Sequence, residues 1–246
     1  MIALKKILFT RQLIILFLIF ASPRLLSQEN HFVYSNQVWA QYYTQTQLNE
    51  SYAIVCDAGI RSKLDLSEKT SGLFRVGLQK KMNSSFVAAI GAAWFGFYKE
   101  GKLNKNEWRG WQEITYTHKL KRLNLQHRLR LEERSFLSVK SSSSNFNYRS
   151  RYRLYLTLPI NNPTITKNTF YLICGDELFI DFGKEVIYNF NQNRVLYGLG
   201  YKFNDRTTFS LTYVDQIARK NKGNYFERTN IIWASLTQKF AKKAKK

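Results

Sequence analysis

Arginine and glutamate recur at every second position in the middle of the chain, a spacing that places their side chains on one face of a β-sheet. A guanidinium group binds a carboxylate through two parallel hydrogen bonds. Charges removed from water need such partners, because an unpaired buried charge is strongly destabilising. The pattern therefore predicts a network of enclosed ion pairs. Its expected members are Arg128, Arg130, Glu132, Arg151, Arg153, Glu177 and Arg194.

Other patterns that carry chemistry are missing from the sequence. It has no Gly-rich phosphate loop, no His/Cys spacing typical of a metal site and no G-x-S-x-G nucleophile motif. We therefore expect neither a metal nor a cofactor. Cys56 and Cys174 are the two cysteines, and they fit either one disulfide in an oxidising compartment or, as we favour, two small apolar side chains.

The elements that must position these charges are long strands. In the segment Leu123–Arg134, the four leucines fall on one parity and most polar residues on the other, which indicates a strand with two unlike faces. A 12-residue strand is ~40 Å long and, tilted by ~45°, rises ~28 Å, close to the hydrocarbon thickness of a membrane. The expected strands are Asn36–Gln47, Ser51–Ser62, Gly72–Gln79, Ser85–Tyr98, Glu107–Leu120, Leu123–Arg134, Asn147–Leu158, Thr169–Asp181, Gln192–Phe203, Arg206–Ile217 and Tyr225–Phe240.

These strands predict an all-β fold, a transmembrane antiparallel up-and-down β-barrel of about 10–12 strands. Their connections largely alternate between short and long, as do the periplasmic turns and external loops of outer-membrane barrels. The connection Pro159–Asn168 is the exception, because it is long where a short turn is due. Single-chain bacterial barrels normally have an even number of strands. We therefore favour 12 strands, with one missed near His31–Ser35, over 10.

The chain divides into a targeting segment and one barrel. Lys5, Lys6 and Arg11 precede the short apolar run Leu13–Phe20, the pattern of a secretory signal peptide, so residues 1–27 are expected to be removed. The run is well under the ~20 residues of a spanning helix. Residues 28–246 then form the barrel with a short Lys-rich C-terminal tail. The expected location is the cell outer membrane of a Gram-negative bacterium.

The formal net charge of +21 is compatible with a nucleic-acid partner, but an exported chain meets phosphate-rich membrane surfaces instead. We expect no nucleic acid. The expected partners are outer-membrane lipids and lipopolysaccharide, together with the barrel-assembly machinery during insertion. The sequence leaves the oligomeric state open.

The arginines decide which face of each strand points inward. Six of them on two neighbouring strands would each cost ~2–4 kcal/mol on the lipid face near the midplane. Their sum would rival the ~5–15 kcal/mol stability of a whole domain. They are therefore expected to face the lumen. The six are Arg128, Arg130, Arg134, Arg149, Arg151 and Arg153, and the same parity turns Asp57, Arg61, Arg75, Glu113, Glu132, Glu177, Arg194 and Glu227 inward.

Two interpretations of this lumen stay open. The charged side chains could fill the barrel with salt bridges, or they could line a porin-like path for small solutes. We favour the filled interior, because long arginine side chains from adjacent strands occupy much of the width. The expected role is therefore structural support, binding of a solute or passage of small solutes. Aromatic residues, including Trp39, Trp94, Trp108 and Trp111, are expected in belts at the two membrane interfaces.

Two alternatives to this function belong to other classes of protein. His118 and His127 fall on the outward parity, where a lipid-modifying enzyme of lipase or deacylase type could use them with Ser135 as nucleophile and Glu133 as orienting acid. Amphipathic histidines at the interface explain the same pattern, and we favour that explanation. The second alternative is a soluble periplasmic β-protein.

Five phrases of the sequence carry a resemblance. They are N-E-W-R-G-W-Q at 106–112, R-L-R-L-E-E-R at 128–134, Y-R-S-R-Y-R-L at 148–154, G-D-E-L-F-I at 175–180 and Q-N-R-V-L-Y-G-L-G-Y-K-F at 192–203. Together they resemble a domain-of-unknown-function family of outer-membrane β-barrels from Bacteroidetes-type bacteria. The resemblance implies fold and location, and no activity. Trp108 stands where the family pattern leads us to expect a His, and a Lys tail follows the final Phe240.

Overall fold

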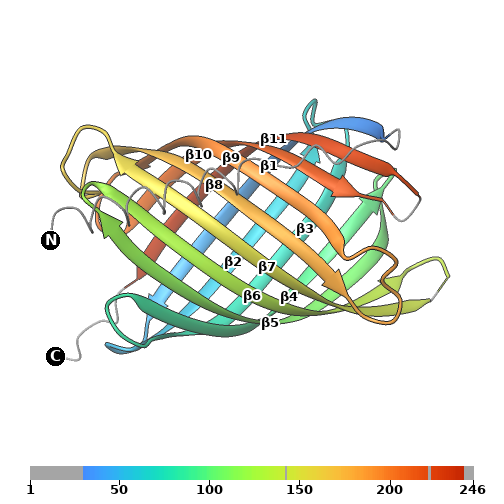
Figure 1. Cartoon of the computed structure of the whole chain (residues 1–246), viewed down its shortest axis with the longest axis horizontal. Coiled ribbons are helices and arrows are strands. Elements are labelled where there is room, and N and C mark those ends of the chain that lie inside the picture. Colours follow the sequence, from blue (N-terminus) through green and yellow to red (C-terminus); the bar gives the residue numbers. More distant parts are fainter. Residues whose placement is uncertain (1–29, 142, 221–222, 241–246) are drawn as a thin grey trace, which may run out of the picture. The chain divides into compact units, whose positions relative to one another are not determined.

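The computed structural model describes residues 30–141, 143–220 and 223–240, and the predicted signal peptide lies outside them. The described chain forms one closed barrel in which each strand pairs with its neighbours in the sequence (Figure 1). Its strands are β1 (His31–Gln47), β2 (Tyr52–Lys63), β3 (Lys69–Lys81), β4 (Phe86–Lys99), β5 (Lys102–Leu120), β6 (Leu123–Ser138), β7 (Ser144–Pro159), β8 (Thr169–Phe182), β9 (Phe190–Lys202), β10 (Thr207–Arg219) and β11 (Tyr225–Phe240). No helix in the described part of the chain is long and apolar enough to cross a membrane.

Every predicted strand is present, and the barrel architecture is confirmed. Several strands run further than their hydrophobic pattern indicates. The strand β5 begins at Lys102 rather than Glu107, because Lys102 still pairs with Lys99 across the tight turn after β4. Cys56 and Cys174 are free thiols, as favoured from the sequence.

The barrel closes through β1 and β11, which run parallel from His31↔Tyr225 to Thr46↔Phe240, whereas the other neighbouring pairs are antiparallel. An odd number of up-and-down strands makes this unavoidable, since the first and last strands then point the same way. The described residues form 11 strands, within the expected range of about 10–12, and the favoured count of 12 is therefore wrong. The segment His31–Ser35 is no separate strand but the first part of β1.

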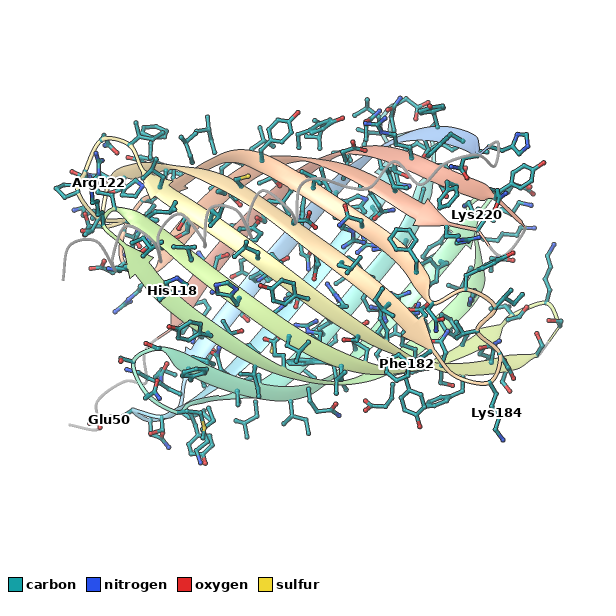
Figure 2. The ribbon with its side chains drawn as sticks, in the orientation of Figure 1. Glu50, His118, Arg122, Phe182, Lys184 and Lys220 are labelled. Atoms are coloured by element: carbon teal, nitrogen blue, oxygen red, sulfur yellow. The ribbon has the colours of Figure 1, made fainter. Side chains whose placement is uncertain are left out.

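The two ends of the barrel are named here after residues labelled in Figure 2. The Arg122 rim carries the connections 48–51, 82–85, 121–122, 160–168 and 203–206. The Lys184 rim carries 64–68, 100–101 and 183–189, together with the described residues 139–141, 143, 220, 223 and 224. The expected alternation of short turns and long loops is wrong. Connection 100–101 at the Lys184 rim is as short as 121–122, because ladder pairing extends the strands into the segments taken as loops.

The long connection 160–168, predicted as the exception, is fixed at the Arg122 rim. The Arg122 guanidinium donates to the carbonyl oxygens of Pro159, Ile160 and Asn162 at 2.8–3.3 Å. Ile165 at its middle packs against a buried cluster that includes Trp39, Tyr171 and Leu196. The extra length thus lets the connection fold back onto the inner wall.

Large aromatic side chains line the inner wall where glycine leaves room for them. A Cβ on Gly77 or Gly91 would stand only 2.4–2.6 Å from the Trp111 indole, and one on Gly200 would stand 2.1 Å from the Tyr171 ring. Trp39 and Trp111 are each 3% exposed and belong to the interior. Their predicted place in a membrane-interface belt is wrong, since they share the inward parity of Gln41 and Glu113. Trp108 does face outward, at 60% exposure.

The parallel closure can be tested by cross-linking, because Ala40 on β1 lies directly beside Ala234 on β11. In a Cys56→Ser, Cys174→Ser background, we expect a short thiol-reactive cross-linker to join Ala40→Cys to Ala234→Cys in nearly all molecules. Ala40→Cys with Ala92→Cys is the matched control, since β4 is three strands away from β1 and neighbouring strands are ~4.8 Å apart. Equal cross-linking of both pairs would contradict the closure.

Candidate functional site

The candidate site is the arginine-rich lumen, built mainly by the neighbouring strands β6 and β7. Their alternation turns Arg128, Arg130 and Arg134 on β6, and Arg149 and Arg151 on β7, into the barrel, where each is 5–7% exposed. The antiparallel register sets Arg130 opposite Arg151. Like charges directly opposite one another repel, so the wall holds together only if carboxylates lie between them.

Glu132 supplies one such bridge. Its carboxylate, 1% exposed, accepts a hydrogen bond from Arg151 Nη1 at 2.6 Å and from Arg109 Nη1 at 3.3 Å, and lies 3.8 Å from Arg130 Nη1. Three guanidinium groups from three adjacent strands therefore share one carboxylate.

Glu177 on β8 supplies the second bridge. Its Oε1 accepts hydrogen bonds from Arg128 Nη2 at 2.5 Å and from Arg151 Nη2 at 2.7 Å. Glu113 holds Arg130 at 2.6 Å and lies 3.7 Å from Arg128. The five predicted members Arg128, Arg130, Glu132, Arg151 and Glu177 thus form one continuous network, in which Arg151 links the two bridging carboxylates.

A second layer, nearer the Lys184 rim, was not predicted as part of the site. Glu107 is fully buried and accepts from Arg109 Nε at 2.7 Å and Arg134 Nε at 2.5 Å. Asp181 accepts from Arg134 Nη1 at 3.1 Å and Arg149 Nε at 2.6 Å. The signal was available in the sequence, because Glu107 and Arg109 share the inward parity of Glu113.

Arg153 and Arg194, the other two predicted members, stand apart from the network, as does Arg61. Among the described residues, no carboxylate lies within ion-pair distance of these three groups. Arg153 Nη2 donates to Gln126 at 3.2 Å, and Arg194 Nε donates to Gln216 at 2.8 Å. The Arg61 guanidinium carbon lies 3.9 Å from the centre of the Trp39 ring, and that of Arg194 lies 5.0 Å from it. Amides and ring faces satisfy them in part and leave their charge uncompensated.

These side chains surround a cavity of about 730 Å³ inside the barrel. Ten arginines line it, and six carboxylates among the described residues either line it or bind these arginines, so the balance is 10 − 6 = +4. The arginines are Arg61, Arg75, Arg109, Arg128, Arg130, Arg134, Arg149, Arg151, Arg153 and Arg194, and the carboxylates are Asp57, Glu107, Glu113, Glu132, Glu177 and Asp181.

Towards the Arg122 rim the lining of the cavity changes from charged to neutral. Gln45 lies two residues before the end of β1, and Thr117 and Gln126 lie three residues from the 121–122 turn. We call this zone the neutral vestibule. It comprises the amide and hydroxyl side chains of Gln45, Gln79, Thr115, Thr117, Gln126, Ser210, Thr212, Ser235 and Thr237.

The outward histidines form a stack rather than a hydrolase site. The rings of His118 and His127 are parallel within 8°, with centroids 5.4 Å apart, and His127 Nδ1 is 2.8 Å from the Tyr152 hydroxyl (His118 is labelled in Figure 2). Ser135 is eight residues from His127 along β6, roughly 26 Å in an extended strand. Glu133 instead accepts a hydrogen bond from Gln112. The proposed nucleophile and acid therefore do not meet the histidines.

The sequence model of a family described as "protein of unknown function (DUF2490)" matches residues 36–227. This match spans β1 to the start of β11 and includes the lumen network. A search of curated proteins finds no match.

Removal of one bridging carboxylate tests the network. Glu132→Gln leaves three guanidinium groups short of one counter-charge, and breaking a buried pair in this way costs about 3–5 kcal/mol. We expect the midpoint of urea unfolding in detergent micelles to fall accordingly. Glu133→Gln is the matched control, because the adjacent carboxylate pairs with Gln112 on the outer wall, so no guanidinium loses its counter-charge and the midpoint should fall less. Equal loss in both variants would contradict the role of Glu132.

Proposed function

The chain belongs to the DUF2490 family of proteins of unknown function, and we propose that it is an outer-membrane β-barrel that binds small anionic solutes in its lumen. The observation that carries the proposal is the set of three arginines, Arg61, Arg153 and Arg194, which line one cavity without a carboxylate partner among the described residues. A guanidinium group presents five N–H donors in a planar fork that matches oxyanions. Such groups in a cavity attract an anion from solution.

The outer wall of the barrel supports a membrane location. Large apolar side chains from five strands, Ile60, Phe74, Ile90, Leu129 and Leu172, are 47–57% exposed on it. A water-soluble monomer rarely exposes a contiguous apolar surface beyond a few hundred Å². The shortest strand has 12 residues, which at a tilt of ~45° rises ~28 Å, near the thickness of a hydrocarbon core. Both features disfavour a soluble periplasmic protein.

Polar groups on the same outer wall are paired with one another across neighbouring strands. Such pairing is what lipid requires, because hydrocarbon offers no hydrogen-bond partner. The pairs are Gln112 with Glu133 at 3.3 Å, Asn193 with Asp176 at 2.6 Å, and Arg228 with Asp215 at 2.6 Å. We therefore propose outer-membrane lipids and lipopolysaccharide as the surroundings of the wall, and the barrel-assembly machinery as the partner during insertion.

Binding in the lumen is favoured over free passage. The ion pairs of Glu107, Glu132, Glu177 and Asp181 link strands β5 to β8 inside the barrel, and the arginines that form them line the cavity. A solute inside the cavity meets guanidinium groups that carboxylates already hold, together with Arg61, Arg153 and Arg194, which have no carboxylate partner among the described residues.

Fractionation tests the location. We expect the protein to stay in the membrane fraction after 1 M salt and carbonate washes, since burial of an apolar wall does not depend on surface charge. It should also show heat-dependent mobility in detergent gels, because a closed barrel keeps its fold until heated. A matched periplasmic protein of the same cells serves as the control. Release by either wash would contradict the membrane proposal.

Titration with inorganic phosphate tests anion binding. In the purified barrel, replacing Arg61, Arg153 and Arg194 together by Gln should weaken phosphate binding at least tenfold, measured by calorimetry in detergent micelles. Lys80, Lys121 and Lys184, which lie at the two rims, are changed to Gln as the control with the same loss of charge. An equal effect of both triple variants would mean that overall charge, not the cavity, binds the anion.

A further inference from the structure

The neutral vestibule has a chemistry that binding of a bare anion does not require. Its side chains come from six strands and carry amides or hydroxyls only. Some already pair across the wall: Gln45 Nε2 donates to Gln79 at 2.9 Å, and Ser210 and Ser235 share a hydrogen bond of 2.7 Å. An anion needs donors alone, whereas an amide or a hydroxyl can both donate and accept.

Groups with both capacities match a ligand that is rich in hydroxyls. Each sugar hydroxyl also donates one hydrogen bond and can accept others. A wall of Gln, Ser and Thr can therefore bind several hydroxyls without a charged side chain. Two donor atoms at the inner limit of this zone lack a hydrogen-bond partner among the described residues, namely Arg153 Nε and the indole Nε1 of Trp233. The Arg153 guanidinium carbon also lies 4.7 Å from the centre of the Tyr155 ring.

The two zones meet at Gln126. This residue belongs to the neutral vestibule and accepts the hydrogen bond of Arg153, the uncompensated arginine nearest to it. A ligand with an acid group at one end and hydroxyls along the rest would therefore find a cation and neutral partners in the right order. The cavity of about 730 Å³ falls within the ~300–1,000 Å³ range of small-molecule sites.

We propose that the lumen takes a sugar that carries a phosphate group, with the phosphate at Arg153 and the hydroxyls in the neutral vestibule. This assignment rests on the proposed anion-binding function and names its ligand class. No covalent step is involved. The phosphate provides the negative counter-charge for Arg153, and the sugar hydroxyls exchange hydrogen bonds with Thr115, Thr117 and Gln126.

Calorimetry on the purified barrel in detergent micelles can separate the ligand class from the function. Three probes are compared: inorganic phosphate, glucose and glucose 6-phosphate. We expect glucose 6-phosphate to bind at least tenfold more tightly than inorganic phosphate, and glucose alone to bind at least tenfold more weakly than glucose 6-phosphate. Equal affinity for the two phosphates would overturn the sugar assignment and leave anion binding in place. Absence of binding by all three probes would overturn both.

A hydroxyl deletion provides the structural test. Thr115→Val keeps the shape of the side chain and removes one vestibule hydroxyl, so it should weaken glucose 6-phosphate severalfold and leave inorganic phosphate unchanged. Thr207→Val is the control, because Thr207 lies on β10 outside the cavity lining. Heat-dependent gel mobility verifies that both variants fold. An unchanged sugar-phosphate affinity in Thr115→Val, or an equal loss in both variants, would contradict the assignment.

Discussion

Compensation of charge inside a closed sheet is the constraint on which this barrel depends. Ten guanidinium groups share its interior, and moving even one ion out of water costs several kcal/mol unless a partner meets it. The carboxylates are therefore used more than once: Glu132, Glu177, Glu113, Glu107 and Asp181 each lie within ion-pair distance of two or three arginines. Sharing links strands β5 to β8 from within, in addition to their backbone ladders.

The antiparallel register creates this arrangement. Tight connection 121–122 sets Glu113 opposite Arg130, so opposite charges meet across β5 and β6. The next pair of strands sets arginine opposite arginine, at Arg128↔Arg153 and Arg130↔Arg151. Glu177 from β8, which lies opposite Arg153, reaches back to Arg151 and Arg128 instead. The repulsion between β6 and β7 is thus relieved from the two outer strands, and Arg153 is left without a carboxylate.

Local periodicity made the strands and their inward faces predictable from the sequence, because a period of two is fixed by each strand alone. The number of strands could not be predicted in this way. The rule that barrels have an even number of strands excludes a parallel pair, whereas β1 and β11, which are far apart in the sequence, pair in parallel. Trp39 and Trp111 were assigned to interface belts by residue type, although their parity already turned them inward. The inward fold of 160–168 depends on Arg122 and Ile165, whose tertiary contacts leave no periodic signal.

The two interpretations of the lumen, filled by salt bridges or open to small solutes, apply to different parts of the same interior. In the arginine-rich part of the lumen, full passage would require carboxylates such as Glu132 to release arginines, and each broken buried pair costs about 3–5 kcal/mol. One such event already lowers the open population by two to four orders of magnitude, since 1.4 kcal/mol is about a factor of ten. Towards the Arg122 rim no ion pair has to break, because Arg153 and its neutral neighbours face the cavity directly. The same arginine-rich wall therefore favours binding of a solute over its free passage.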